Sequence, residues 1–150
     1  MPNIQQGMSN FQRSPSSRIA VIGAGCSGLA ALKVLAENGL TNLTCFEKNG
    51  QIGGNWVYTA GEGHSSVCET THIISSKWLS RFSDFPMPED YPDYPSHQQV
   101  LAYFQQYAQR FDLERFVRFN AEVARAEKIE NERWKLILRD GTSEEFDYLL

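Results

Sequence analysis

Three closely spaced glycines constrain the fold of this chain more than any other feature. They are Gly23, Gly25 and Gly28, inside the stretch RIAVIGAGCSGLAAL at residues 18–32. The run RIAVI before them is short and apolar, which is typical of a strand buried on both faces of a parallel sheet. The residues after them place leucines and alanines at helical spacing, and Gly39 follows as a candidate helix C-cap.

A second apolar run, LTCFE at residues 43–47, predicts the next buried strand. Strand, glycine turn, helix and strand together make a βαβ unit. A GxGxxG pattern alone is a weak signal, but here it follows a strand and opens a helix, which is the context of a dinucleotide-binding turn. The alternative is a tight turn that binds nothing. We therefore expect an α/β fold with a Rossmann-like parallel sheet.

Each glycine has a physical role in such a turn. Gly23 allows the turn, Gly25 lets the backbone approach a pyrophosphate, and Gly28 lets helix and strand pack closely. The helix N-terminus offers unpaired N–H groups and the positive end of its dipole to a phosphate. The candidate contacts are therefore Gly23, Ala24, Gly25, Cys26, Ser27 and Gly28.

An acidic residue closes the second strand. Glu47 lies 19 residues after Gly28, close to the ~20 residues expected for an acid that binds the ribose hydroxyls. A 2′-phosphate would face this carboxylate with little screening, which argues against NADP at this turn. The residues leave FAD or NAD as the ligand.

The next stretch is FEKNGQIGGNWVY, residues 46–58. An acidic strand end followed by IGGNW resembles the flavin-containing monooxygenases, in which a GGxW segment follows the ribose-binding glutamate and touches FAD. Residues 75–113, with a Ser-Lys pair, the loop DFPMPEDYP and a helix after it, look like the same family. The resemblance covers residues 18–150. It implies FAD as the cofactor and adds the contacts Gly54, Asn55 and Trp56.

The segment GEGHSSVCETTHIISS places His64, Cys68 and His72 at intervals of four residues. On a helix this spacing would put three metal ligands on one face. Glycines, β-branched residues and serines disfavour a helix here, so we expect no metal site. By resemblance to bacterial members of the family, His64 lies near the flavin; the alternative is a surface loop histidine.

Four prolines in FPMPEDYPDYP, residues 85–95, exclude a helix or a central strand there. Ser96 then begins a helix as its N-cap, and Gln99 completes a capping box. The apolar stripe of this helix predicts core packing rather than a ligand site. It consists of Val100, Leu101, Phe104, Tyr107, Ala108 and Phe111.

Beyond this helix the pattern changes to period two. Residues 115–129 and 133–140 predict strands, the DGT at residues 140–142 predicts a hairpin, and residues 144–150 predict a final strand. In flavin-binding folds of this type, a small antiparallel β-meander crosses over and its last strand rejoins the parallel sheet. Val123 matches the family position whose backbone lies beside the adenine; the alternative is an ordinary core valine.

Composition excludes several function classes. The formal net charge of −4 gives no basic surface for nucleic acid or anionic lipid. No apolar run approaches the ~20 residues that span a bilayer. Three cysteines without metal-type spacing suit a reducing compartment, so we expect a cytoplasmic protein. Residues 1–17 lack the apolar core of a signal peptide; we expect them to be a disordered polar tail, and residues 18–150 to form the FAD-binding domain.

The resemblance also implies further segments. The family continues with an ATG-like turn, an identifying histidine motif and a second GxGxxG-type turn for NADPH, and these 150 residues contain none of them. We therefore expect the N-terminal part of a longer monooxygenase that uses FAD and NADPH. Its substrates would be O₂ and a small molecule with a soft nitrogen or sulfur. A homodimer is compatible with this interpretation.

One position departs from the family. An asparagine near the reactive edge of the flavin usually stands three residues before the lysine of the Ser-Lys pair, and here Ile74 takes that place before Lys77. Isoleucine cannot form the hydrogen bonds of an amide, so His72 or the Ser75 hydroxyl is the candidate substitute. No catalytic residue is assigned.

Two other function classes stay open. One is a flavin-dependent reductase of the same two-dinucleotide fold, against which the absence of a CxxC or similar redox pair counts. The other is a non-enzymatic module that senses flavin or nucleotide and regulates a partner.

Overall fold

A parallel sheet of four strands forms the centre of the described residues, 16–60 and 66–150, of this computed structural model. Its order is β3-β2-β1-β7, from Val117–Arg118, Leu43–Phe46, Ile19–Ile22 and Tyr148–Leu149. A second, antiparallel sheet has the order β4-β5-β6, from Val123–Lys128, Trp134–Leu138 and Ser143–Phe146. The expected α/β fold with a parallel sheet and a small antiparallel meander is confirmed.

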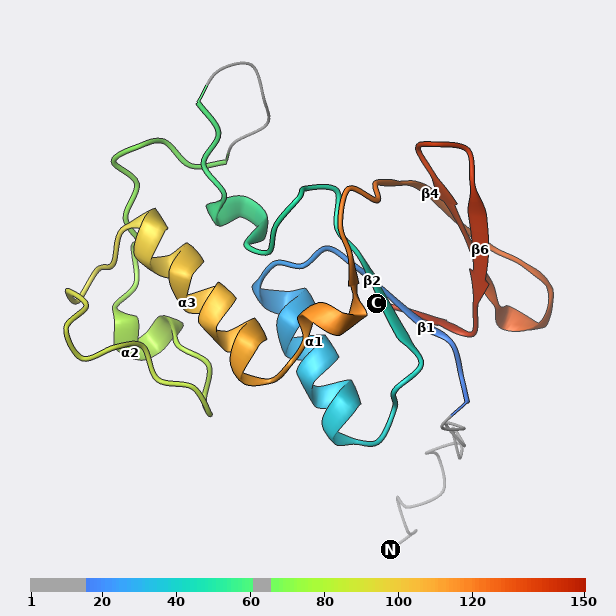
Figure 1. Cartoon of the computed structure of the whole chain (residues 1–150), viewed down its shortest axis with the longest axis horizontal. Coiled ribbons are helices and arrows are strands. Elements are labelled where there is room, and N and C mark those ends of the chain that lie inside the picture. Colours follow the sequence, from blue (N-terminus) through green and yellow to red (C-terminus); the bar gives the residue numbers. More distant parts are fainter. Residues whose placement is uncertain (1–15, 61–65) are drawn as a thin grey trace, which may run out of the picture.

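The helices are α1 (Cys26–Glu37), α2 (Lys77–Ser80) and α3 (His97–Arg110). Short 3-10 turns are η1 (Gly54–Trp56), η2 (Glu114–Phe116) and η3 (Glu130–Glu132). Figure 1 shows α1 and α3 on one side of the parallel sheet and the meander on the other. The central sheet is therefore covered on both faces, as its apolar strands require.

The alternation of side chains along β1 divides the core in two. Ile19 and Val21 pack into the cluster that contains the buried residues of α1 and α3. Ala20 points to the opposite face and packs with the meander cluster, which includes Phe46, Leu136 and Phe146. Successive residues of a strand face opposite sides, so one short strand anchors both layers.

Both helix ends predicted from the sequence are confirmed. Gly39 has φ +77°, and its N–H donates to the Ala36 carbonyl while that of Leu40 donates to Leu35, the pattern of a Schellman motif. At the start of α3, the Ser96 hydroxyl accepts from the Gln99 N–H and the Gln99 side chain accepts from the Ser96 N–H. This is the expected capping box.

The prediction of one strand over residues 115–129 is wrong. Residues 114–116 form η2, β3 pairs in parallel with β2, and β4 begins only at Val123 in the other sheet. Between them, Asn120 takes a left-handed conformation with φ +54°, which turns the chain from one sheet into the other. Alternation of polar and apolar residues continues across this turn, so the pattern alone does not reveal it.

The prediction of one strand over residues 144–150 is also wrong, because the run divides at Asp147. β6 ends at Phe146 and pairs with β5, whereas β7 pairs in parallel with β1. Asp147 makes this change of sheet: its carboxylate accepts from the Arg18 N–H at 2.7 Å, and its own N–H donates to the Arg18 carbonyl at 2.9 Å. The expectation that the last strand rejoins the parallel sheet is confirmed.

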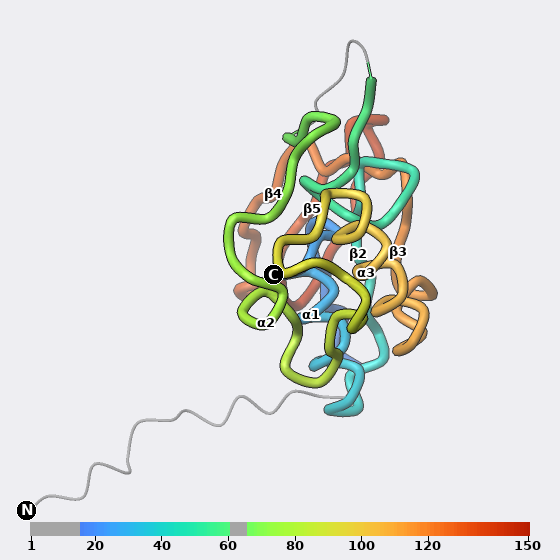
Figure 2. Tube along the Cα trace, turned by 90° about the vertical axis from the view of Figure 1, so that its left-hand side faces the viewer, coloured from blue at the N-terminus to red at the C-terminus, as the bar shows by residue number. Residues whose placement is uncertain are grey.

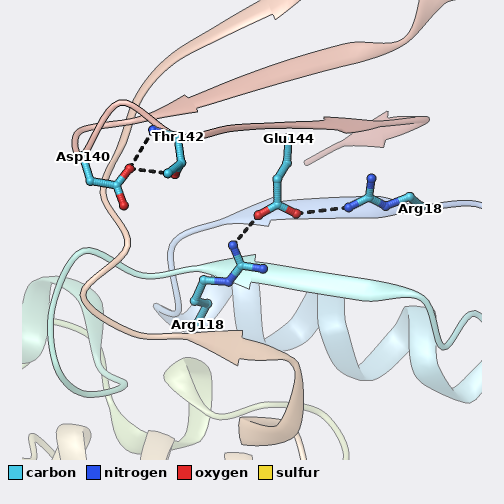
Figure 3. A network of polar contacts seen from close by, with 5 residues as sticks. All are labelled: Arg18, Arg118, Asp140, Thr142 and Glu144. Atoms are coloured by element: carbon cyan, nitrogen blue, oxygen red, sulfur yellow. Dashed lines mark hydrogen bonds and ion pairs between the residues drawn. The ribbon is translucent and has the colours of Figure 1, made fainter.

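A polar network joins the meander to the parallel sheet (Figure 3). The Glu144 carboxylate of β6 accepts from Arg18 at 3.1 Å and from Arg118. The Arg18 guanidinium lies 4.7 Å from the ring centre of Phe146. Near it, the hairpin closes as predicted, because the Asp140 carboxylate accepts from both the N–H and the hydroxyl of Thr142. The contacts of Arg18 and Arg118 with β6 connect the antiparallel sheet to the parallel sheet.

The segment between α2 and α3 packs against both long helices. In Figure 2 the stretch that carries α2 runs beside α3. The Tyr103 hydroxyl of α3 accepts from the Phe82 N–H at 2.8 Å and donates to the Phe85 carbonyl at 2.5 Å. Lys33 of α1 forms an ion pair with Asp84. The proline-rich loop is thereby fixed to the helical layer without regular secondary structure of its own.

We predict an acid-sensitive contribution from Asp84. The Lys33 ammonium, which donates to Asp84, holds the pKa of that carboxyl below its ordinary value of 3.8. A lowered pKa stabilises the fold above the unfolded-state value and loses that contribution as the pH falls through the folded-state value. Asp84→Asn should therefore lower the melting temperature near pH 7 but hardly change it at about pH 2. Asp90→Asn, on the same loop, is the control, and an equal effect of both variants would contradict the assignment.

Candidate functional site

A cavity of about 480 Å³ opens where β1 and β2 end. The crevice at the carboxyl ends of parallel strands is the usual ligand position in open α/β sheets. Five segments line it: the glycine turn, the end of β2, the η1 turn, the loop at Ser66 and the start of the meander. The predicted residues that the structure brings together there are Gly23, Gly25, Cys26, Ser27, Gly28, Glu47, Gly54, Asn55, Trp56 and Val123.

Two predicted residues, Ala24 and Ser75, do not line this cavity. Ala24 is buried beneath the turn, and its N–H donates to the Glu47 carboxylate at 2.8 Å. Ser75 is exposed, with its hydroxyl 2.6 Å from that of Ser80. His64 lies outside the described residues. Ile74, at the position of the family asparagine, is 99% exposed and also lies away from the cavity lining.

Several residues that line the cavity were not predicted from the sequence. Lys48 and Asn49 directly follow Glu47, and Glu122 precedes Val123. Ser66 reaches the cavity from a distant loop, and its hydroxyl donates to the Asn55 side chain at 3.3 Å. Adjacency to an identified residue was a usable signal for the first three. No sequence pattern pointed to Ser66.

Glu47 is the most constrained side chain of the cavity. It is 3% exposed, and its two carboxylate oxygens accept from the N–H groups of Ala24 and Asn49, each at 2.8 Å. Its backbone accepts from the Ala121 N–H and donates to the Arg118 carbonyl. A carboxylate oxygen has two lone pairs, so each can accept one further hydrogen bond from a ligand hydroxyl.

The N-terminus of α1 faces the same cavity. Gly25 is its N-cap, without a capping side chain, and the first turn carries no acidic residue. The N–H groups of Cys26, Ser27 and Gly28 find no acceptor among the described residues. Unpaired N–H groups and the positive end of the helix dipole together favour a bound anion, above all a phosphate.

Gly28 and Gly25 are glycines for different reasons. A Cβ on Gly28 would lie 1.9 Å from the Gly23 carbonyl oxygen, so the fold itself excludes any side chain there. Gly25 has an ordinary extended conformation with φ −83°, and a Cβ would meet only the Gly54 Cα at 3.6 Å. The fold therefore does not need a glycine at position 25, although this residue lines the cavity.

Both glycines of the second pair have a positive φ, which favours glycine. Gly53 has φ +142°, and a Cβ there would come within 2.3 Å of a Leu101 methyl on α3. Gly54 has φ +54°, and its Cβ would lie 2.9 Å from the Gly25 Cα. These glycines let the η1 turn fit between α3 and the first glycine turn, which places Asn55 and Trp56 at the cavity.

The described residues hold no cluster of three histidine, cysteine or acidic side chains arranged to bind a metal ion. Cys45 lies in the core, where burial raises the pKa of its thiol to about 12. Cys68 is exposed, and a hydrogen bond from Thr71 lowers the pKa of its thiol. The helices among the described residues are all too short or too polar to cross a membrane.

The parallel sheet ends in a cavity that has a helix N-terminus on one side and a buried acid on the other. This arrangement defines a dinucleotide-binding domain of the Rossmann class. Comparison with known proteins identifies it more narrowly. The profile of the family described as "Flavin-binding monooxygenase-like" matches residues 16–143. The chain belongs to this family.

Individual relatives agree with this assignment. The chain is 44% identical over 113 residues to flavin-containing monooxygenase 5 of Mus musculus, covering 74% of this chain and 21% of that protein. The structure of S-allyl-L-cysteine S-oxygenase from Allium sativum is similar with a TM-score of 0.79 and 27% identity, over 89% of this chain and 35% of that one. An oxidized steroid monooxygenase bound to NADP gives a TM-score of 0.74 and 26% identity, over 89% and 25%. The chain thus spans about a fifth of the mouse relative's length.

We predict that the two glycines respond oppositely to alanine. Gly28→Ala should destabilise the fold by about 2–3 kcal/mol, because the new methyl group overlaps a backbone carbonyl that cannot move aside. Gly25→Ala should leave the free energy of unfolding unchanged or raise it by up to about 1 kcal/mol, since alanine restricts the unfolded chain. Urea unfolding of both variants tests this. A large loss of stability in Gly25→Ala would show that the fold does need this glycine.

Proposed function

We propose that this cavity binds the adenosine diphosphate part of FAD. We further propose that the protein is a flavin-dependent, NADPH-using monooxygenase that oxygenates soft nitrogen or sulfur atoms of small molecules. The observation that carries the proposal is Gly25: the fold tolerates a side chain there, yet the position faces unpaired N–H groups in a cavity. A pyrophosphate that comes close to the backbone accounts for both facts.

The described residues would hold FAD in three places. The N–H groups of residues 26–28 would bind the pyrophosphate, and the free lone pairs of Glu47 would accept from the ribose hydroxyls. Val123 and its neighbours at the start of the meander would lie beside the adenine. Asn55 and Trp56 would support the remainder of the cofactor, whereas Ser75 and His64 keep only the family resemblance as support.

Bound FAD would supply the transfer of electrons from NADPH to O₂ and of an oxygen atom to the substrate. The described residues of this chain bind and orient the cofactor, and Glu47 does so as a carboxylate already fixed by two backbone N–H groups. NADPH is supported by the NADP named for the steroid monooxygenase of similar structure. A sulfur substrate is supported by the S-oxygenase of Allium sativum.

Several finer statements belong to the same proposal. We place the FAD-binding domain at residues 18–150 and the polar tail at residues 1–17; within the tail, only Ser16 and Ser17 are described. The cysteines Cys26, Cys45 and Cys68 are unpaired, which supports a reducing, cytoplasmic location and disfavours a reductase that uses a disulfide. A homodimer and the absence of nucleic-acid partners stay predictions from composition and family.

The first test uses the side chain at position 25. Gly25→Ala should weaken FAD binding by at least about tenfold, and Gly25→Val should abolish it, because the side chain occupies the place of the pyrophosphate. The dissociation constant can be measured by the fluorescence of titrated FAD. Gly50→Ala is the matched control, because its φ is ordinary, a Cβ there would meet only Asn120 atoms at 3.5 Å or more, and it does not line the cavity; it should bind FAD as the unchanged protein does. Retention of full affinity by Gly25→Val would contradict the proposal.

A second test concerns the Glu47 carboxylate. A charge-assisted hydrogen bond contributes on the order of 1.5–3 kcal/mol, so Glu47→Gln should weaken FAD binding by about tenfold or more. The amide also turns one acceptor into a donor that faces a backbone N–H, and the melting temperature should fall as well. Glu114→Gln, an exposed acid away from the cavity, serves as the control. Equal FAD affinities for both variants and the unchanged protein would remove Glu47 from the site.

A further inference from the structure

Lys77 is a buried cation that the proposed function does not use. It is 5% exposed, although lysine is almost never buried without a partner. Its ammonium group donates to three backbone carbonyls of the proline-rich loop, those of Pro88 at 3.4 Å, Glu89 at 2.8 Å and Tyr91 at 2.5 Å. An ammonium group has three donors and no acceptor, so this set uses its hydrogen-bonding capacity completely.

The partners of this ammonium are neutral. None of the carboxylates in the described part of the chain lies within ion-pair distance of it. Carbonyl dipoles that converge on one point replace the hydration shell of a cation, as they do in the filters of potassium channels. The Trp78 ring, 5.2 Å from the ammonium nitrogen, adds an aromatic face to the same environment.

We propose that residues 88–91 form a cation-binding turn whose resident cation is the Lys77 ammonium, and whose ligand class is a primary ammonium ion. The carbonyls of this turn point toward a common centre. The Pro88 carbonyl also accepts from the Tyr91 N–H at 3.2 Å, whereas no backbone N–H of the described residues donates to the Glu89 and Tyr91 carbonyls. Without the ammonium, the partly buried Glu89 and Tyr91 carbonyls would lose their donor while their dipoles still converge, which is costly.

The position of this cation matters for the rest of the loop. Residues 73–77 form backbone hydrogen bonds with residues 93–95, which directly precede α3. The Lys77 N–H donates to the Asp93 carbonyl at 2.8 Å, and the Ile73 N–H donates to the Pro95 carbonyl at 3.0 Å. The ammonium adds hydrogen bonds from the Lys77 side chain to residues 88–91, next to these two backbone hydrogen bonds. Lys77 is therefore a positioning residue that fixes residues 73–77 against the start of α3, and it has no free donor for a phosphate or for proton transfer.

Amine labelling of the unchanged protein is the first test, and it needs no flavin. The chain has other lysines for comparison, of which Lys48 and Lys128 are exposed. With an acetylating reagent specific for amines, we expect Lys77 to react about a hundredfold more slowly than these two, because it reacts only when the loop opens locally. Mass spectrometry of the digested protein gives the rates. Reaction of Lys77 as fast as Lys48 would overturn the proposal.

Chemical rescue is the second test. Lys77→Ala removes a fragment equivalent to n-propylammonium and leaves the carbonyl turn empty. We expect amide exchange at Ile73 and Tyr91, whose N–H groups donate to the Pro95 and Pro88 carbonyls, to become at least about tenfold faster. Millimolar n-propylammonium should restore most of the protection. Choline, a cation without N–H donors, should not restore it. Equal rescue by choline, or no change in exchange on removing Lys77, would overturn the proposal.

Two further variants separate the competing explanations. Glu89→Gln removes a side-chain charge but keeps the backbone carbonyl, so it should leave the exchange of the Ile73 and Tyr91 amides unchanged if carbonyls hold the ammonium. An effect as large as that of Lys77→Ala would assign the site to carboxylates instead. Lys33→Ala breaks an ion pair with Asp84 and should show no rescue by n-propylammonium. If Lys77→Ala does not fold, recovery of folding with n-propylammonium supports the proposal. If n-propylammonium does not restore folding, the acetylation rate of Lys77 in the unchanged protein decides.

Discussion

The Glu47 carboxylate accepts hydrogen bonds from two N–H groups that belong to different loops, the glycine turn and the segment after β2. The backbone of the same residue pairs with Arg118 and Ala121, on either side of the turn that leads into the meander. One residue thus connects three walls of the cavity. Because a buried carboxylate requires such partners, its position fixes the turn and the strand end together.

Four glycines beside the cavity differ in whether the fold leaves room for a side chain. At Gly28 and Gly54 a Cβ would lie too close to backbone atoms, and Gly53 and Gly54 have a positive φ that favours glycine. Gly25 has that room and an ordinary backbone conformation. This difference is the basis of our proposal that a ligand approaches the backbone at Gly25, in a chain that belongs to the flavin-binding monooxygenase-like family.

The sequence predicted the βαβ unit, the capping box and the meander, because glycines, caps and hairpin residues act locally. It failed at residues 115–129 and 144–150, where the alternating pattern continues while the chain changes sheets at Asn120 and Asp147. Most of the candidate site residues come together, but Ser75 lies away from the cavity and Ser66 was not foreseen. Contacts that depend on distant loops, such as the three carbonyls around Lys77, leave no periodic pattern in the sequence.

The central claim is that the cavity at the glycine turn holds the adenosine diphosphate part of FAD. Titration of the ¹⁵N-labelled protein with FAD, followed by amide chemical shifts, tests it at each residue. The account predicts the largest changes at Cys26, Ser27 and Gly28, with smaller ones at Asn49 and Val123. Unchanged signals at the start of α1, with the main shifts at the groove beside Gln105 and Gln109, would contradict it.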